Sequence, residues 1–202
     1  IAEALAPRGG AVFSLGRSNG VDVSNAATVE NWFLANGEVD NVIFTAGSQA
    51  PGGKVSELDI DAAKTAFEIK FWGSVKVAQI AAKYIRTGGT LTLTSGFLAR
   101  KTVPGTFVKT TMNAALEAGV KILARELAPI RVNIVSPGLT DTEAYSGMGE
   151  SDRNQMFANA AKALPVGRVA SPQDVAQGYL FAIDCPSITG AVIDIDGGAL
   201  IS

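Results

Sequence analysis

Two polar residues stand one helical turn apart in the stretch GTFVKTTMNAALEAG at residues 105–119. The residues from Ala114 onward are good helix formers, and the four-residue spacing puts Lys109 and Asn113 on one helix face. Burial or a like charge can lower the pKa of a lysine from about 10.4 towards neutrality and make it an acid. Such a polar pair is unexpected on a helix face that otherwise suits burial. Either the pair has a chemical role, or the lysine extends into solvent at a cleft rim beside an amide that caps local backbone.

Composition and charge exclude several classes of function. The chain has 202 residues, of which 47% are hydrophobic and 18% charged, as in an α/β domain with a full core. Its net charge of −2 and the lack of a basic stripe argue against a nucleic-acid partner. No apolar run approaches the roughly 20 residues of a membrane span. The absence of histidine removes His-based triads and the commonest zinc sites, and the lone Cys185 favours a cytoplasmic location.

Short apolar runs alternate with helical patterns along the chain. The runs predict strands at residues 11–15, 39–47, 88–96, 131–138 and 190–198, and the patterns predict helices at residues 24–37, 56–86, 105–128 and 171–184. This alternation predicts an α/β fold, with a single domain over residues 1–202 built on a doubly wound parallel sheet. The polar segment 139–170 resembles a lid, and its Tyr145, Met148, Met156 and Phe157 suggest a medium-sized apolar substrate.

Doubly wound sheets bind ligands at the carboxyl ends of their strands, and small residues recur at those ends here. They are Gly16-Arg17, Thr45-Ala46-Gly47, Ser95-Gly96 and Ser136-Pro137-Gly138. Tight turns also need glycine, so one such end alone does not distinguish a turn from a binding site. Four ends of the same kind favour a site.

Several landmarks in the right order make the chain resemble a short-chain dehydrogenase/reductase. TAG at residues 45–47 resembles the family's N-A-G element, APIRVNIVSPGLTDTE resembles its P-G segment with threonines, and IDGG resembles its closing strand. The resemblance runs from end to end. It implies a Rossmann-like fold that binds NAD(H) or NADP(H), a small-molecule substrate, and a homodimer or homotetramer. The family uses the helices that correspond to residues 56–86 and 105–128 as its dimer face. Val120, Ile122 and Leu123 would then pack either against the partner subunit or in the core of this chain.

The resemblance also bears on how the given sequence begins. Ile1 lies in an amphipathic pattern, IAEALAPRGG, and the family has a strand and a Gly-rich phosphate-binding turn just before this point. Because that strand would be central in the sheet, its loss would expose strand edges and core. The resemblance therefore predicts that the given sequence omits an N-terminal segment.

The resemblance implies a set of cofactor-binding residues. In the family, the residue after the second strand contacts the adenosine ribose, and an acidic residue there suits the free hydroxyls. In this chain the corresponding segment, Gly16-Arg17-Ser18, contains no acidic residue. Arg17 can pair with a 2′-phosphate, which favours NADP(H) over NAD(H), unless it is a solvated surface arginine. Asp22-Val23 matches the family's D-V element beside the adenine, although Asp22 also suits a turn. The remaining positions are Thr45, Ala46, Gly47, Pro137, Gly138, Thr140 and Thr142.

The catalytic positions of the family hold unusual residues in this chain. The family uses Asn, Ser, Tyr and Lys, and those places fall on Lys70, Gly96 (with Ser95 one residue earlier), Lys109 and Asn113. The usual tetrad is therefore absent, and Tyr145 in the lid is the only other tyrosine placed to reach a substrate.

Two hypotheses suit these departures. In the first, the protein is a divergent oxidoreductase in which Lys109 donates the proton and Lys70 lowers its pKa as a like charge. Asn113 would then bond the ribose hydroxyls and Ser95 would polarise a carbonyl. In the second, the protein binds the dinucleotide without dehydrogenase activity, as a redox sensor or regulatory subunit. We favour the first hypothesis because cofactor-binding positions on a reductase fold set the expectation.

Overall fold

The computed structural model describes residues 1–47 and 49–202 and contains a parallel sheet of four strands. The strands lie in the order β1-β2-β3-β4, with bounds Val39–Ile43, Ile85–Thr94, Arg131–Pro137 and Val192–Ile195. Val42 pairs with Leu91, Leu91 with Val132, and Ile134 with Val192. Parallel neighbours require crossover connections, and helices supply them here.

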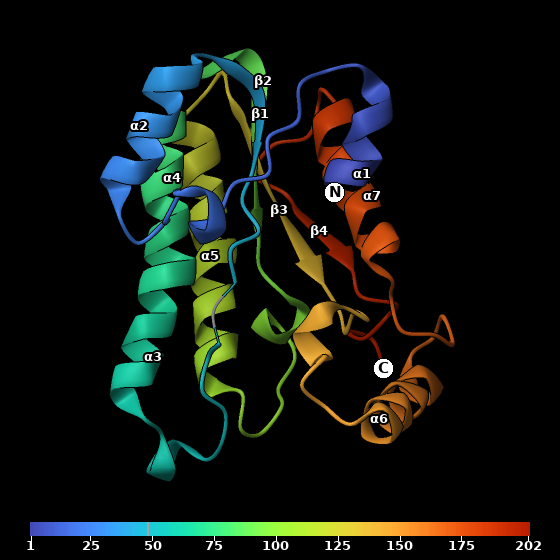
Figure 1. Cartoon of the computed structure of the whole chain (residues 1–202). Coiled ribbons are helices and arrows are strands. Elements are labelled where there is room, and N and C mark those ends of the chain that lie inside the picture. Colours follow the sequence, from blue (N-terminus) through green and yellow to red (C-terminus); the bar gives the residue numbers. More distant parts are fainter. Residues whose placement is uncertain (48) are drawn as a thin grey trace.

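Helices cover both faces of the sheet. Figure 1 shows α2 (Ala26–Asn36), α4 (Gly73–Ala81) and α5 (Phe107–Glu126) on one face, and α1 (Ala2–Leu5) and α7 (Pro172–Asp184) on the other. This arrangement confirms the predicted doubly wound α/β class. The core lies between β2, β3 and the helices α4 and α5, where Leu91, Leu93, Val132 and Ile134 are fully buried.

Helix boundaries follow the local capping signals. The Asn25 side chain accepts a hydrogen bond from the Ala27 backbone at the start of α2, and Gly37 ends that helix. At the start of α7, Ser171 forms a reciprocal capping box with Asp174, and Pro172 is the first helical residue. The predicted starts of both helices are confirmed.

The predicted strand at residues 11–15 is wrong. Val12, Phe13 and Leu15 are 40%, 53% and 45% exposed, and the segment forms no ladder with any described strand. A buried parallel strand needs a paired neighbour and cover on both faces. Phe13 instead packs edge-on against Trp32 of α2, with ring centroids 5.2 Å apart.

The predicted helix at residues 56–86 is divided into three parts. It consists of α3 (Ile60–Phe67), a π-helical turn (Glu68–Trp72) and α4, and β2 already begins at Ile85. A π-turn adds a residue to the helix and so rotates the side chains on either side of it. Turns of this kind occur often at functional sites. Lys70 is the middle residue of this one.

The segment expected to be irregular contains a helix, α6 (Glu150–Ala163). Acidic Glu150 and Asp152 in its first turn and Lys162 in its last complement the helix dipole, a signal the sequence prediction did not use. Figure 1 shows α6 near the end of the sheet to which β3 and β4 point. None of the helices within residues 1–47 and 49–202 is long and apolar enough to cross a membrane.

Candidate functional site

Three of the predicted catalytic residues meet at the carboxyl end of β2. Lys70 Nζ donates a hydrogen bond to Asn113 Oδ1 at 2.7 Å and another to the Ser95 carbonyl oxygen at 3.0 Å. The π-turn presents Lys70 to α5, and Ser95 directly follows β2. The structure therefore brings Lys70, Ser95 and Asn113 together from three elements that are distant in sequence.

The surroundings of Lys70 lower its pKa from 10.5 to about 8. Burial is the main cause, because it penalises the charged ammonium, and the like charge of Lys109 adds to it. Lys109 lies one turn before Asn113 on α5, and its side chain is exposed. The sequence prediction gave the shift to Lys109 with Lys70 as its cause. The shift found here is that of Lys70, with Lys109 as a contributing charge.

The hydroxyl of Ser95 is bound within the protein. Its Oγ donates a hydrogen bond of 2.8 Å to Glu117 Oε1, and both residues are buried. Glu117 also pairs with Arg100, whose Nε lies 2.8 Å from Glu117 Oε2. Arg100 also donates a hydrogen bond to Asp194 on β4, with 2.9 Å between Nη1 and Oδ2. The proposed role of Ser95 in polarising a carbonyl would require its hydroxyl to leave Glu117.

Sequence reasoning missed this group of charged residues, Glu117, Arg100 and Asp194. A signal for Glu117 was present, because it lies four residues after Asn113 and so on the same helix face. Only the fold brings Arg100 and Asp194 beside it, since they are 94 positions apart in the chain.

Glycines at the strand ends serve two different purposes. A Cβ on Gly138 would lie 2.7 Å from the Asp196 Cα, and one on Gly96 would lie 3.1 Å from Asn113 Nδ2, so both glycines permit close internal packing. A Cβ on Gly16 or Gly47 would meet no atom within 4 Å. Close packing therefore explains the glycines at positions 96 and 138, whereas it does not explain Gly16 and Gly47.

The predicted adenosine end of the site lies at the 3₁₀ turn Arg17–Asn19. Arg17 and Ser18 are exposed, and the Gly16 amide donates to Asn19 Oδ1 at 2.6 Å. Asp22 Oδ1 accepts from the Ser24 backbone and hydroxyl, bonds that lower the pKa of Asp22. Asp22 thus builds a turn, as the alternative interpretation of it expected.

Val23 and the end of β1 connect this turn to the helix that follows Lys70. A Cβ on Gly73 would lie 3.2 Å from Val23 Cγ2, so the glycine allows Val23 to pack against the start of α4. Thr45 and Gly47, after β1, are exposed, and Ala46 packs against the core.

The predicted nicotinamide end and the lid are held by local bonds. The Gly138 amide donates to the Ile195 carbonyl at 3.0 Å, which fixes the chain after Pro137. Thr140 Oγ1 donates to the Gly138 carbonyl at 3.1 Å, and Thr142 Oγ1 accepts from the Ala144 amide. Tyr145 stacks edge-on against Phe157 of α6, and burial raises the pKa of its phenol. Tyr145 is not among the residues that contact Lys70.

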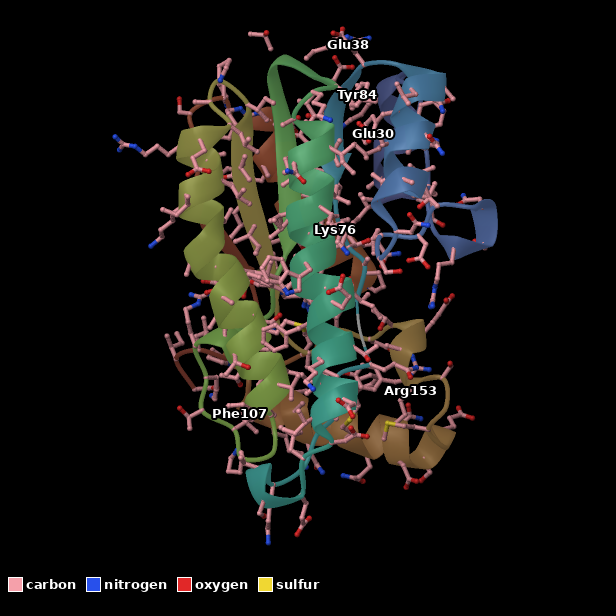
Figure 2. All side chains as sticks on the ribbon, turned by 90° about the vertical axis from the view of Figure 1, so that its left-hand side faces the viewer. Glu30, Glu38, Lys76, Tyr84, Phe107 and Arg153 are labelled. Atoms are coloured by element: carbon pink, nitrogen blue, oxygen red, sulfur yellow. The ribbon has the colours of Figure 1, made fainter. Side chains whose placement is uncertain are left out.

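Figure 2 shows how the helices on this face are oriented. Phe107 marks the start of α5, Arg153 lies on α6 near that end, and Glu38 and Tyr84 lie at the opposite end of the molecule. Lys76 on α4, labelled in Figure 2, bonds the Ser24 carbonyl at 3.1 Å and pairs with Glu68. Lys70 and Lys76 therefore have different partners: Lys70 bonds Asn113 in the candidate site, and Lys76 bonds Ser24 and Glu68.

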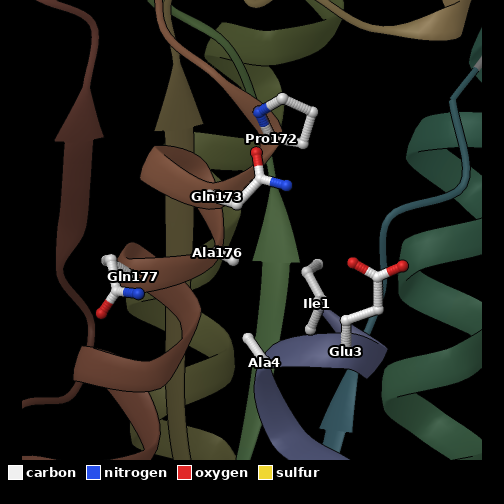
Figure 3. Close-up of a pocket in the computed structure, with 7 residues that line it drawn as sticks. All are labelled: Ile1, Glu3, Ala4, Pro172, Gln173, Ala176 and Gln177. Atoms are coloured by element: carbon white, nitrogen blue, oxygen red, sulfur yellow. The ribbon is translucent and has the colours of Figure 1, made fainter.

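Two hollows of the structure lie away from these residues. One, of about 250 Å³, lies between α1 and α7 and is lined by residues such as Ile1, Gln173 and Gln177 (Figure 3). Another, of about 320 Å³, adjoins Ile85 and Ile130 at the amino ends of β2 and β3. Neither hollow is lined by a strand-end residue of the predicted site. The candidate site is therefore identified by its residues and their hydrogen bonds, not by the size of a hollow.

Comparison with known proteins gives the family. The model of the family described as Enoyl-(Acyl carrier protein) reductase matches residues 2–199. The chain belongs to the short-chain dehydrogenase/reductase family. A short-chain dehydrogenase/reductase of Stachybotrys chlorohalonatus is 34% identical over 169 residues, which are 82% of this chain and 65% of that protein. The matched part of this chain thus spans somewhat less than two thirds of that relative.

Two further short-chain dehydrogenase/reductase comparisons concern the cofactor. The crystal structure of a small-chain dehydrogenase in complex with NADPH is 51% identical, with a TM-score of 0.90 over 93% of this chain and 86% of that one. The NADH-dependent enoyl-[acyl-carrier-protein] reductase of Escherichia coli is 28% identical over 90% of this chain and 70% of that protein. Members of the family bind nicotinamide dinucleotides. Of these two relatives, one was solved with NADPH and the other is named as an NADH enzyme.

Proposed function

We propose that this protein is an NADP(H)-dependent oxidoreductase that interconverts a carbonyl compound and an alcohol. The observation that carries the proposal is the position of the Lys70 ammonium group, which bonds Asn113 and the Ser95 carbonyl at the carboxyl end of β2, where burial lowers its pKa to about 8. An acid is most effective when its pKa lies near the working pH. A lysine in this state can supply the proton that reduction of a carbonyl requires.

Arg17, Gly16 and Gly47 support the proposed cofactor. Arg17 offers an exposed guanidinium whose charge also acts on Asp22, and a guanidinium suits bidentate binding of phosphate. Space beside Gly16 and Gly47 admits the dinucleotide, which supplies a hydride when bound. The relative solved with NADPH supports the same preference. The predicted positions Ser18, Val23, Thr45, Ala46, Pro137, Thr140 and Thr142 complete the proposed site, together with Asp22 and Gly138, which also serve a turn and internal packing.

The second candidate is a protein that binds the dinucleotide without dehydrogenase activity, as a sensor or regulatory subunit. The hydrogen bond from Ser95 Oγ to Glu117 favours it, because the hydroxyl nearest to the family's serine position is bound to a carboxylate. Loss of a polarising hydroxyl would leave binding intact and slow any reaction.

One experiment separates the two candidates. NADPH and NADH binding to the full protein is measured by fluorescence and thermal shift, and NADPH consumption is then followed with para-nitrobenzaldehyde and diacetyl. We expect tighter binding of NADPH and measurable turnover. Binding without turnover would favour the sensor, and absence of binding would reject both.

We also propose a cytoplasmic homodimer or homotetramer. Trp72, Phe107 and Ile122 on the π-turn and α5 are each about half exposed, at 49%, 53% and 57%, and would be covered by a partner that packs on these helices. Of the residues named for a dimer face, Val120 is fully buried in the core and Leu123 packs against it. Ile122 is therefore the member of that set available to a partner.

A further inference from the structure

We propose that Lys70 is the proton donor of this site and that Lys109 is the charge that tunes it, the reverse of the roles that the sequence suggests. The assignment rests on the oxidoreductase function proposed above. It follows from how the two side chains are held, since an effective acid must be fixed in position as well as suitably acidic.

Lys70 is fixed, and Lys109 is not. Two of the three N–H donors of Lys70 are occupied, by the Asn113 amide oxygen and the Ser95 carbonyl. Within the described chain no third acceptor and no carboxylate pairs with the ammonium group, so one N–H remains for a ligand oxygen. Lys109 is exposed, and the described residues give it no hydrogen bond or ion pair to fix its long side chain.

The charges around Lys70 leave it a usable acid. Three helical segments pack against the π-turn: α3, α4 and α5. On α3, Asp61 and Lys64 pair with each other, and on α4 Lys76 pairs with Glu68. On α5, Glu117 is bound to Arg100 and Ser95, which leaves Lys109 as the charge that acts on Lys70.

The proton step is simple to balance. As the carbonyl carbon receives the hydride from NADPH, one N–H bond of Lys70 breaks and its proton passes to the substrate oxygen, which becomes a hydroxyl. Lys70 is left as a neutral amine and regains a proton from water. The amide oxygen of Asn113 and the carbonyl of Ser95 hold the nitrogen in place throughout.

The first test measures the acid in the protein without cofactor. Acetylation of each lysine by acetic anhydride is followed across a pH series by peptide mass spectrometry. We expect a midpoint for Lys70 near 8, and a higher midpoint in Lys109→Met because the like charge is gone. Lys121→Met, which alters an exposed lysine further along α5, should leave the Lys70 midpoint unchanged. A Lys70 midpoint near 10, or one indifferent to Lys109→Met, would overturn the assignment.

The second test measures turnover with NADPH and para-nitrobenzaldehyde. Lys70→Arg keeps the positive charge but cannot release a proton at this pH, and Lys70→Met removes both. We expect both variants to bind NADPH and lose turnover by a factor on the order of a hundred to ten thousand. In Lys109→Met the alkaline fall of the rate should move to higher pH, because the like charge that lowers the pKa of Lys70 is gone. Loss of turnover in Lys109→Met with Lys70→Arg still active would overturn the assignment. An unaltered protein that does not consume NADPH would instead reject the proposed activity itself.

Discussion

The ammonium nitrogen of Lys70 lies 2.7 Å from the amide oxygen of Asn113, across the contact between a π-turn and a long helix. The bond joins a cation and a neutral acceptor, so no counter-charge offsets the burial of the lysine. This explains why burial lowers the pKa of Lys70 to about 8. The lowered pKa makes the unfolding free energy depend on pH in a defined direction.

Lys70 should make the protein more stable as pH rises from about 8 to about 10.5. Its pKa is lower in the folded than in the unfolded chain, so within this window the unfolded chain binds more protons and unfolding becomes less favourable as pH increases. The whole effect is at most about 3.5 kcal/mol, since one pKa unit corresponds to about 1.4 kcal/mol. Urea unfolding across this range, for the unaltered protein and for Lys70→Met, measures it.

The control for this pH dependence is Lys121→Met. That variant loses an exposed lysine of α5 and should follow the unaltered protein at every pH, whereas Lys70→Met should lose the rise. Parallel curves for the unaltered protein and Lys70→Met would contradict the lowered pKa.

Glu117→Leu should destabilise the protein by about 3 kcal/mol. The substitution leaves the Arg100 guanidinium without one of its two carboxylates and removes the acceptor of the buried Ser95 hydroxyl. Glu117→Gln keeps an acceptor for Ser95 and should cost less. Chemical denaturation gives both values, and Glu126→Leu, at an exposed position on the same helix, should change stability by less than about 0.5 kcal/mol. Equal effects at positions 117 and 126 would argue against the network.

Two glycine substitutions should separate packing from binding. Gly138→Ala places a Cβ 2.7 Å from the Asp196 backbone and should cost about 1–3 kcal/mol of stability. Gly47→Ala meets no atom within 4 Å, so it should leave stability nearly unchanged and weaken NADPH binding by filling space proposed for the cofactor. Thermal unfolding and NADPH titration of both variants test this contrast. Normal NADPH affinity in Gly47→Ala would remove that residue from the proposed site.

The sequence was enough to predict the sheet and most of its helices, because strong signals coincide there. Apolar runs mark β1 to β4, and Asn25 and Ser171 are capping residues next to helical patterns. The segment at residues 11–15 has the same apolar composition but no described strand beside it, and composition alone does not reveal pairing partners.

The sequence prediction named four members of the candidate site, but it missed Glu117, Arg100 and Asp194 and the interactions among these residues. Family resemblance named Lys70, Ser95, Lys109 and Asn113, and three of them meet in the fold. The π-turn sets the direction of Lys70, and a single inserted helical residue leaves no clear mark in the hydrophobic pattern. Burial depends on that direction, so the shifted pKa was assigned to Lys109 rather than to Lys70.

Arg17→Ala should weaken the binding of NADPH about tenfold to a hundredfold and leave NADH binding nearly unchanged. The reason is that a hydrogen bond from a guanidinium to a phosphate contributes about 1.5–3 kcal/mol, and NADH lacks the 2′-phosphate that Arg17 is proposed to meet. Fluorescence titration with each nucleotide measures the ratio of the NADPH affinity to the NADH affinity. In the unaltered protein this ratio should also decrease with added salt. Arg125→Ala, which removes an exposed arginine of α5, is the matched control. An equal loss of affinity for both nucleotides would show that Arg17 does not read the phosphate.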